Sequence, residues 1–162
     1  MIRPSHCLRP FTPADQLVAR EIYTDAIDSQ AGDLYSAEQI SAWMALAWLP
    51  GVLDRPLAEG RGWVSTIDGE VEAYALRYPD DRLALLYCRG RSCRAGLATA
   101  LLNQLEAEAR AEGLMQLVTD ASRCSVQLLL RCGWRLGSSQ WIEIGGVAIE
   151  RYPMVKDLQA MS

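Results

Sequence analysis

The stretch with the clearest capacity for chemistry lies just before a long apolar helix. Residues 89–95 hold three arginines, and Gly96 and Ala98 open the helix that follows. A helix N-terminus leaves its first N–H groups unpaired, and small residues there let a phosphate group approach the backbone. The pattern predicts a main-chain anion site, with further contacts from the hydroxyl of Thr99 and from Arg89, Arg91 and Arg94. The alternative interpretation is a glycine that starts a helix beside solvated arginines.

Other phosphate and metal motifs are missing from the sequence. No G-K-[ST] follows the glycine, and one glycine stands where a dinucleotide fingerprint needs three. His6 is the sole histidine, and the sequence contains no H-E-x-x-H. The five cysteines are odd in number and show no C-x-x-C spacing. These features predict reduced thiols, a cytoplasmic location and no metal site.

Length and composition indicate one ordinary globular domain. The chain has 162 residues, of which 50% are hydrophobic and 22% charged. We therefore expect a single domain over residues 1–162. The net charge of −4 predicts no attraction to nucleic acid or to a membrane surface. No apolar run approaches the roughly 20 residues of a membrane span.

Periodicity and turn residues predict the elements that must position this stretch. Helices are expected at about 12–29, 36–48, 96–112 and 123–132. Strands are expected at 7–11, 63–67, 71–78, 83–88, 114–119, 134–144 and 147–152. Asp68-Gly69 and Gly145-Gly146 supply hairpin turns, and residues 55–61 are predicted to form a loop.

The order of these elements, β-α-α-β-β-β-α-β-α-β-β, predicts an α/β fold with a mixed, mostly antiparallel sheet. The strand-helix-strand segment from Leu83 to Thr119 implies one parallel pair joined by a crossover helix. The apolar run over 83–88 predicts a strand that is buried on both faces.

From Leu8 to Tyr152 the chain resembles the GNAT N-acetyltransferase superfamily, and within it the small bacterial branch called YafP-like. The resemblance rests on four segments in the family's order, residues 33–43, 86–102, 119–134 and 147–154. It implies the GNAT acyl-CoA N-acyltransferase fold, with a splayed central strand pair. It also implies that acetyl-CoA, as co-substrate, gives its acetyl group to a primary amine by direct attack, without a metal or a covalent acyl-enzyme.

The resemblance also implies where acetyl-CoA binds. The family's pyrophosphate loop is Gln/Arg-x-x-Gly-x-Gly/Ala; Gly96 and Ala98 match it, while Cys93 replaces Gln or Arg. The pantetheine arm is then expected beside the strand that ends at Cys88, whose main chain would contact the thioester oxyanion. The implied cofactor-binding set is Leu86, Cys88, Arg89, Arg91, Cys93, Arg94, Ala95, Gly96, Leu97, Ala98, Thr99 and Ser122, the last also a helix N-cap.

Two departures from the family bear on catalysis. Gly90 replaces a common proline, which predicts a looser strand end. Leu129 stands where many members have the Tyr that protonates the departing thiolate, so Tyr87 or water is expected to serve instead. General-base candidates exist, although each has a structural explanation that we favour: Glu72, Asp80, Asp81 and Asp120.

The family's first two helices wall one side of the acceptor cleft. Large aromatic residues with a polar tip suit such a pocket, and we expect Tyr35, Trp43 and Trp63 beside the acceptor. The acceptor itself, a small-molecule or peptide amine, stays open. Dimers are frequent in the superfamily, so a homodimer is a further expectation.

Two other functions compete with acetyl transfer. A GNAT-fold module could bind coenzyme A as a sensor or interaction domain with weak or no catalysis; Leu129, Cys93 and Gly90 favour this alternative. A nucleotide-phosphate hydrolase would use the same helix start, but the sequence lacks a suitable lysine and an evident set of metal carboxylates.

Overall fold

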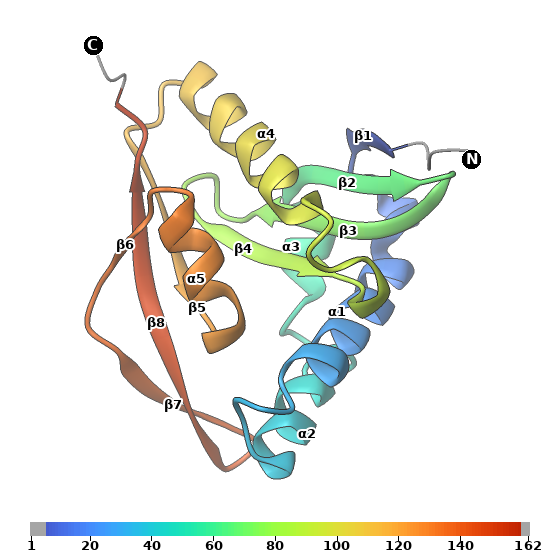
Figure 1. Ribbon diagram of the computed structural model, residues 1–162, viewed down its shortest axis with the longest axis vertical. Coiled ribbons are helices and arrows are strands. Elements are labelled where there is room, and N and C mark those ends of the chain that lie inside the picture. Colours follow the sequence, from blue (N-terminus) through green and yellow to red (C-terminus); the bar gives the residue numbers. More distant parts are fainter. Residues whose placement is uncertain (1–5, 160–162) are drawn as a thin grey trace.

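The strands form two groups that meet at β4 and β5. The computed structural model describes residues 6–159, and in it the first sheet has the antiparallel order β1 (His6–Pro10), β2 (Arg61–Ile67), β3 (Glu70–Arg77) and β4 (Leu83–Cys88). In the second group the long β8 (Val147–Asp157) pairs antiparallel with its neighbours, which are β5 (Gln116–Ala121), β6 (Arg135–Leu136) and β7 (Gln140–Ile144). Figure 1 shows the two groups diverging from a common end.

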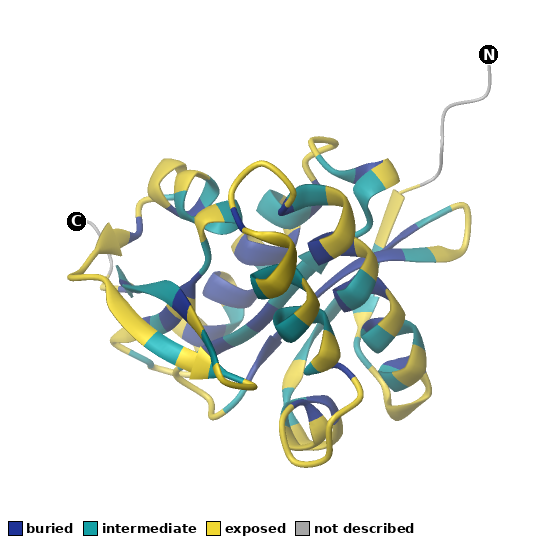
Figure 2. Ribbon diagram, turned by 90° about the horizontal axis from the view of Figure 1, so that it is seen from below, coloured by how far each residue is buried: buried dark blue, intermediate teal, exposed yellow. Residues whose placement is uncertain are grey.

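Helices cover both faces of the first sheet. On one face lie α1 (Gln16–Gln30) and α3 (Asp54–Glu59), and on the other lies α4 (Leu97–Ala111). α2 (Ala37–Ala45) packs against α1 and β8, and α5 (Arg123–Arg131) packs against β5, β6 and β8. Two short 3-10 turns, Pro13–Asp15 and Gly90–Ser92, precede α1 and α4. Figure 2 shows that the buried residues gather where the helices face the strands, and that the outer faces are exposed. None of the helices formed by residues 6–159 has the length and apolar composition to cross a bilayer.

Local sequence signals explain where the helices and turns begin. The Ser36 side chain accepts a hydrogen bond from the Gln39 N–H at 3.1 Å, and Ser122 accepts one from the Cys124 N–H at 3.2 Å. These are the predicted N-caps of α2 and α5. Asp68 and Gly69 have φ values of 51° and 86°, as the predicted two-residue hairpin turn requires. The mostly antiparallel pairing is confirmed, and so is the predicted order of elements apart from an additional helix, α3, and a split of the strand predicted over 134–144.

The expected parallel pair, β4 and β5, is joined at one end only. A single parallel bridge links Arg82 to Val118, whose N–H donates to the Asp81 carbonyl at 2.9 Å. The Thr119 hydroxyl donates to the Leu83 carbonyl at 2.7 Å, and beyond this point the strands separate. The pair is therefore splayed, and the second half of β4 has no neighbouring strand on that edge.

The structure corrects three local predictions. Residues 54–59 form a helix although a loop was expected, because Pro56 lies in the first turn, where its missing N–H costs no hydrogen bond. The single strand predicted over 134–144 is split at Gly137, whose N–H donates to the Pro153 carbonyl. The end of β4 is half-buried rather than buried on both faces, because it borders a cavity.

Candidate functional site

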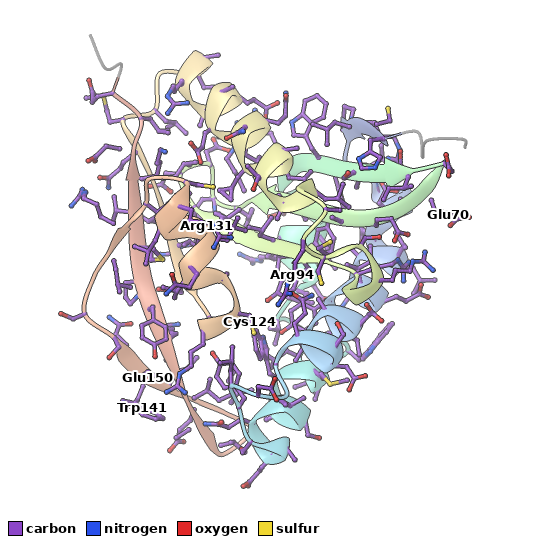
Figure 3. The ribbon with its side chains drawn as sticks, in the orientation of Figure 1. Glu70, Arg94, Cys124, Arg131, Trp141 and Glu150 are labelled. Atoms are coloured by element: carbon purple, nitrogen blue, oxygen red, sulfur yellow. The ribbon has the colours of Figure 1, made fainter. Side chains whose placement is uncertain are left out.

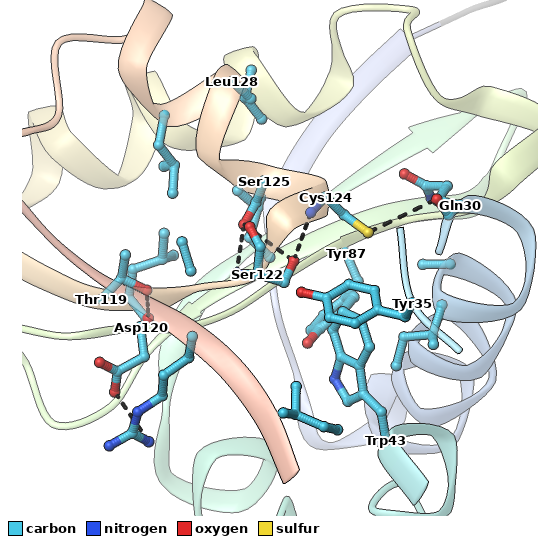
Figure 4. A pocket seen from close by; sticks show the side chains of 18 of the residues that line it. Gln30, Tyr35, Trp43, Tyr87, Thr119, Asp120, Ser122, Cys124, Ser125 and Leu128 are labelled. Carbon is cyan, nitrogen blue, oxygen red and sulfur yellow. Dashed lines mark hydrogen bonds and ion pairs between the residues drawn. The ribbon is translucent and has the colours of Figure 1, made fainter. Parts of the chain in front are cut away.

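A cavity of about 300 Å³ lies where β4 and β5 separate. Its lining comes from α1, α2, β4, α4, β5, α5 and the β7–β8 hairpin, so each layer of the fold contributes to it. Figure 4 shows Tyr35 and Trp43 on one side, with Thr119, Asp120, Ser122 and Ser125 on another. The cavity exists because the two strands separate.

The main chain at the end of β4 points into this cavity. The Arg89 N–H donates to the Glu72 carbonyl of β3 at 2.8 Å, so the main-chain groups of Arg89 point toward β3. Because main-chain groups alternate in direction along a strand, those of Leu86 and Cys88 face away from β3. The Gln30 side chain confirms this direction, since its Nε2 donates to the Cys88 carbonyl at 2.9 Å. The N–H groups of Leu86 and Cys88 are therefore available to a bound carbonyl oxygen.

The start of α4 has the geometry of an anion site. Gly96 has a φ of 82° and provides no side-chain cap, and the first helical bond within α4 runs from the Ala100 N–H to the Gly96 carbonyl. The N–H groups of residues 97–99 thus lack helical partners. An added Cβ on Gly96 would meet nothing within 4 Å. Arg94, also at positive φ (67°), and Ala95 are exposed beside it.

Two of the loop arginines that the resemblance implies for cofactor binding have partners within the protein. Arg91 donates two hydrogen bonds to the Glu72 carboxylate, at 2.8 and 2.5 Å. Arg89 donates to the Val71 carbonyl and lies 3.6 Å from Glu72. Both guanidinium groups are thus held against β3, and Arg94 is the loop arginine without an ion pair among the described residues. Cys93 is half-buried beside them.

Glu72 is a structural anchor rather than a general base. Its carboxylate is 3% exposed and also accepts the Ser92 hydroxyl at 2.5 Å. The bonds from Arg91, more than the opposing effect of burial, lower the pKa of this carboxyl, so it stays ionised and occupied. Asp80 and Asp81 lie in the exposed turn before β4, outside the cavity lining. Asp120 lines the cavity but pairs with Arg82 at 2.9 Å and with Arg151 at 3.7 Å.

Gly90 tightens the strand end instead of loosening it. Its N–H donates to the Asp25 carboxylate at 2.8 Å, and a Cβ at this position would lie 2.3 Å from the Ser29 hydroxyl. A proline at this position would lose the hydrogen bond to Asp25, because it lacks the N–H, and its side chain would overlap Ser29. The loop is therefore held directly against α1.

The side chains at the end of β4 remain protonated at neutral pH. Burial raises the pKa of the Tyr87 phenol, whose ring lies 4.7 Å from that of Tyr23. Burial also raises the pKa of the Cys88 thiol to about 12. A thiol with such a pKa is a weak nucleophile, which accords with direct attack on an acyl group rather than a thiol-bound intermediate.

Two of the three predicted acceptor aromatics line the cavity. The rings of Tyr35 and Trp43 are 5.3 Å apart in an edge-on arrangement, and the Tyr35 hydroxyl accepts the Arg123 N–H at 2.8 Å. Trp63 does not reach the cavity. Its indole N–H donates to Glu108 of α4 at 3.1 Å, because its side chain leaves β2 on the opposite face of the sheet.

The other residues singled out from the sequence lie in or near the cavity wall and at the start of α4. Leu129 is 1% exposed and lines the cavity, so no acid stands at that position. Ala98 and Ser122 line the cavity as well, while Leu97, the first residue of α4, is buried and Thr99 is half-buried. Gln30 was not among the residues predicted from the sequence. Its role depends on how α1 packs beside β4, and no spacing in the sequence signals that contact.

Solved structures similar to this fold are GNAT acetyltransferases. A GCN5-related N-acetyltransferase from Rhodopseudomonas palustris matches with a TM-score of 0.88 and 25% identity, over 97% of this chain and 98% of that one. The PaiA N-acetyltransferase from Thermoplasma acidophilum, in complex with coenzyme A, matches with a TM-score of 0.73 and 15% identity, over 94% and 99%. YncA from Salmonella typhimurium, with its cofactor acetyl-CoA, matches with a TM-score of 0.65 and 20% identity, over 98% and 96%. No family model and no curated protein matches the sequence.

The Glu72 cluster predicts a pH-dependent loss of stability. The pKa of Glu72 is lowered in the folded state, so its contribution is present above the unfolded value of about 4.3 and is lost as pH falls through the folded pKa. We expect Glu72→Gln to lower the free energy of unfolding at pH 7 by about 2 kcal/mol, because it removes the charge-assisted hydrogen bonds from Arg91 and weakens the acceptor of the buried Ser92 hydroxyl. Denaturant unfolding of both proteins between pH 3 and 8 measures this difference, which should shrink toward pH 3. The exposed Glu143→Gln is the control; a Glu72→Gln difference that stays constant with pH contradicts the interpretation.

The contact of Gly90 with α1 predicts a rescue. Gly90→Ala should lower the melting temperature, since its Cβ would overlap Ser29. Ser29→Gly removes the two nearest atoms that this Cβ would meet, so the double variant should recover most of the loss. Thermal unfolding of the two single variants and the double variant measures the coupling. Additive losses would mean that the loop is not held by this contact.

Proposed function

We propose that the chain is a member of the GNAT superfamily and an N-acetyltransferase that uses acetyl-CoA. The observation that supports this most directly is the main chain of Leu86 and Cys88, which faces the cavity at the splayed end of β4. The helix start at Gly96 lies a few residues further along the same segment. One segment therefore offers donors for an acyl group and for an anion, which suits a phosphate-bearing thioester.

The residues present suit coenzyme A. The pyrophosphate would bind the N–H groups at the start of α4, with Arg94 as the free cation beside them. The pantetheine arm would run along the open edge of β4 toward Cys88. Acetyl-CoA supplies an activated acetyl thioester, and the chain's own residues bind and orient it. Arg89 and Arg91 would support the loop through Glu72 rather than contact phosphate.

The chain would promote transfer mainly by orientation and by main-chain donors. The Cys88 N–H would stabilise the negative charge that develops on the thioester oxygen as the amine attacks. Neither the buried Cys88 thiol nor Tyr87 supplies a ready base, because burial holds both in their protonated forms. Water would accept the proton that the amine loses, and water or Tyr87 would protonate the thiolate.

A catalytically silent coenzyme A-binding module is the competing function, favoured by the apolar Leu129 at the cavity wall. Release of free thiol from acetyl-CoA in the presence of primary amines separates the two. Thiol release above the amine-free rate supports the transferase, and binding without release supports the module.

Acetyl-CoA should raise the melting temperature of the protein. At 100 times its dissociation constant, a ligand that binds only the folded state adds about 2.7 kcal/mol to the free energy of unfolding. Gly96→Glu should abolish this shift, because its carboxylate would occupy the phosphate position. Thermal unfolding with and without millimolar acetyl-CoA measures both effects.

Gly113→Glu is the matched control for backbone strain. Gly113 has a φ of 85°, close to the 82° of Gly96, and a Cβ there also meets nothing within 4 Å. It lies at the opposite end of α4, so this variant should lose similar stability and keep the full shift with acetyl-CoA. An unchanged melting temperature of the native protein, or equal shifts in the two variants, would overturn the coenzyme site.

A further inference from the structure

The end of the cavity between α2 and the β7–β8 hairpin has apolar walls. The hairpin contributes Ile142 and Ile149, which pair directly across the strands, and Ile144. The helices contribute Trp43 and Ile27 opposite them. Figure 1 shows the tip of the hairpin beside α2, and the Gln39 side chain joins the two by donating to the Ala148 carbonyl at 2.9 Å.

The charged side chains around the cavity are already paired with one another. Glu150 accepts the Tyr152 hydroxyl at 2.8 Å and lies 3.2 Å from Arg123. Arg151 lies 3.7 Å from Asp120 and donates to Gln140. Within residues 6–159, the cavity lining thus offers no free cation for a substrate carboxylate and no free carboxylate for a polycation.

Gln30 supplies a neutral acceptor beside the proposed reaction centre. Its Nε2 must face the Cys88 carbonyl, because a carbonyl oxygen only accepts hydrogen bonds. Its Oε1 is therefore left to accept an N–H from another group. An uncharged amine meets that requirement, and apolar walls disfavour the ammonium form by desolvation.

On the proposed acetyltransferase function, we infer that the acceptor is a primary amine on a compact apolar or aromatic body that bears no carboxylate. The body lies between the isoleucines of the hairpin and the ring of Trp43, and one amine N–H donates to Gln30 Oε1. The nitrogen forms a bond to the acetyl carbon, the carbon–sulfur bond breaks, and the electron pair leaves with the coenzyme A thiolate. Water takes the proton from the nitrogen.

Matched amines test this inference. We would measure kcat/KM by thiol release at saturating acetyl-CoA for 2-phenylethylamine, phenylalaninamide, phenylalanine and spermidine. Phenylalanine shares the body of the first two but adds a carboxylate, and it should be at least about 100-fold poorer than either, because that charge has no partner in the cavity. Spermidine should be similarly poor. Better turnover of phenylalanine or spermidine overturns the inference and leaves the acetyltransferase function intact.

Variants of β7 locate the specificity. Ile142→Arg places a cation on the inner face of the hairpin. The ratio of kcat/KM for 2-phenylethylamine to kcat/KM for phenylalanine should therefore fall by about tenfold or more. Trp141→Arg is the control, because residue 141 is 64% exposed and points away from the fold, as Figure 3 shows. Ile142→Ala, a milder change, should raise kcat/KM for tryptamine relative to 2-phenylethylamine. If Ile142→Ala and a folded Ile142→Arg both leave these kcat/KM ratios unchanged, the placement of the acceptor beside the hairpin is overturned.

The outcomes separate this inference from the function on which it rests. A thermal shift with acetyl-CoA, but no acetylation of any apolar amine, overturns the acceptor class while the coenzyme site stands. If acetyl-CoA gives no thermal shift and no amine releases thiol from it, both the acceptor class and the proposed acetyltransferase function are overturned.

Discussion

The separation of β4 from β5 is the constraint on which the rest of the structure depends. Buried backbone groups need hydrogen-bond partners, and in a continuous sheet β5 would supply them to Leu86 and Cys88. The strands are instead joined near Arg82 and Val118 and by the Thr119 hydroxyl, and they separate beyond that point, so this main chain faces a cavity. Gln30 satisfies the Cys88 carbonyl. The same feature thus creates the space for a ligand and leaves the donors that would bind its acyl group.

Most of the charged groups in the loop before α4 form ion pairs that fix the conformation of the loop. Glu72 gathers Arg91, Arg89 and Ser92 onto β3, and Gly90 is fixed to α1 through Asp25. Burial of a carboxylate is costly unless it is paired and hydrogen-bonded, and here both conditions are met. An anion site made of N–H groups depends on backbone direction, so a fixed loop serves it better than mobile arginines would. This explains why Arg94 is the one arginine of this basic stretch that forms no ion pair within residues 6–159.

Local features of the fold could be predicted from the sequence, and contacts between distant elements could not. The caps at Ser36 and Ser122 and the Asp68-Gly69 turn depend on neighbouring residues, and all three were predicted correctly. Trp63 lies outside the cavity lining, on the α4 side of the sheet, because strand alternation separates two faces without saying which one borders the cavity. The partnership of Glu72 with Arg91 and that of Gln30 with Cys88 join residues far apart in the chain, so no spacing could signal them.

What remains in the cavity, once its charges are paired, is a set of neutral groups. Burial raises the pKa of the Tyr35, Tyr87, Cys88 and Cys124 side chains, so none of them loses a proton near neutral pH. In the proposed acetyltransferase, a titrating side chain would therefore have little part in lowering the barrier, and the protein would act through orientation and fixed main-chain dipoles. The pH dependence of the proposed transfer would then follow the ionisation of the acceptor amine itself. The basicity and polarity of the amine would be the properties by which the cavity selects its substrate.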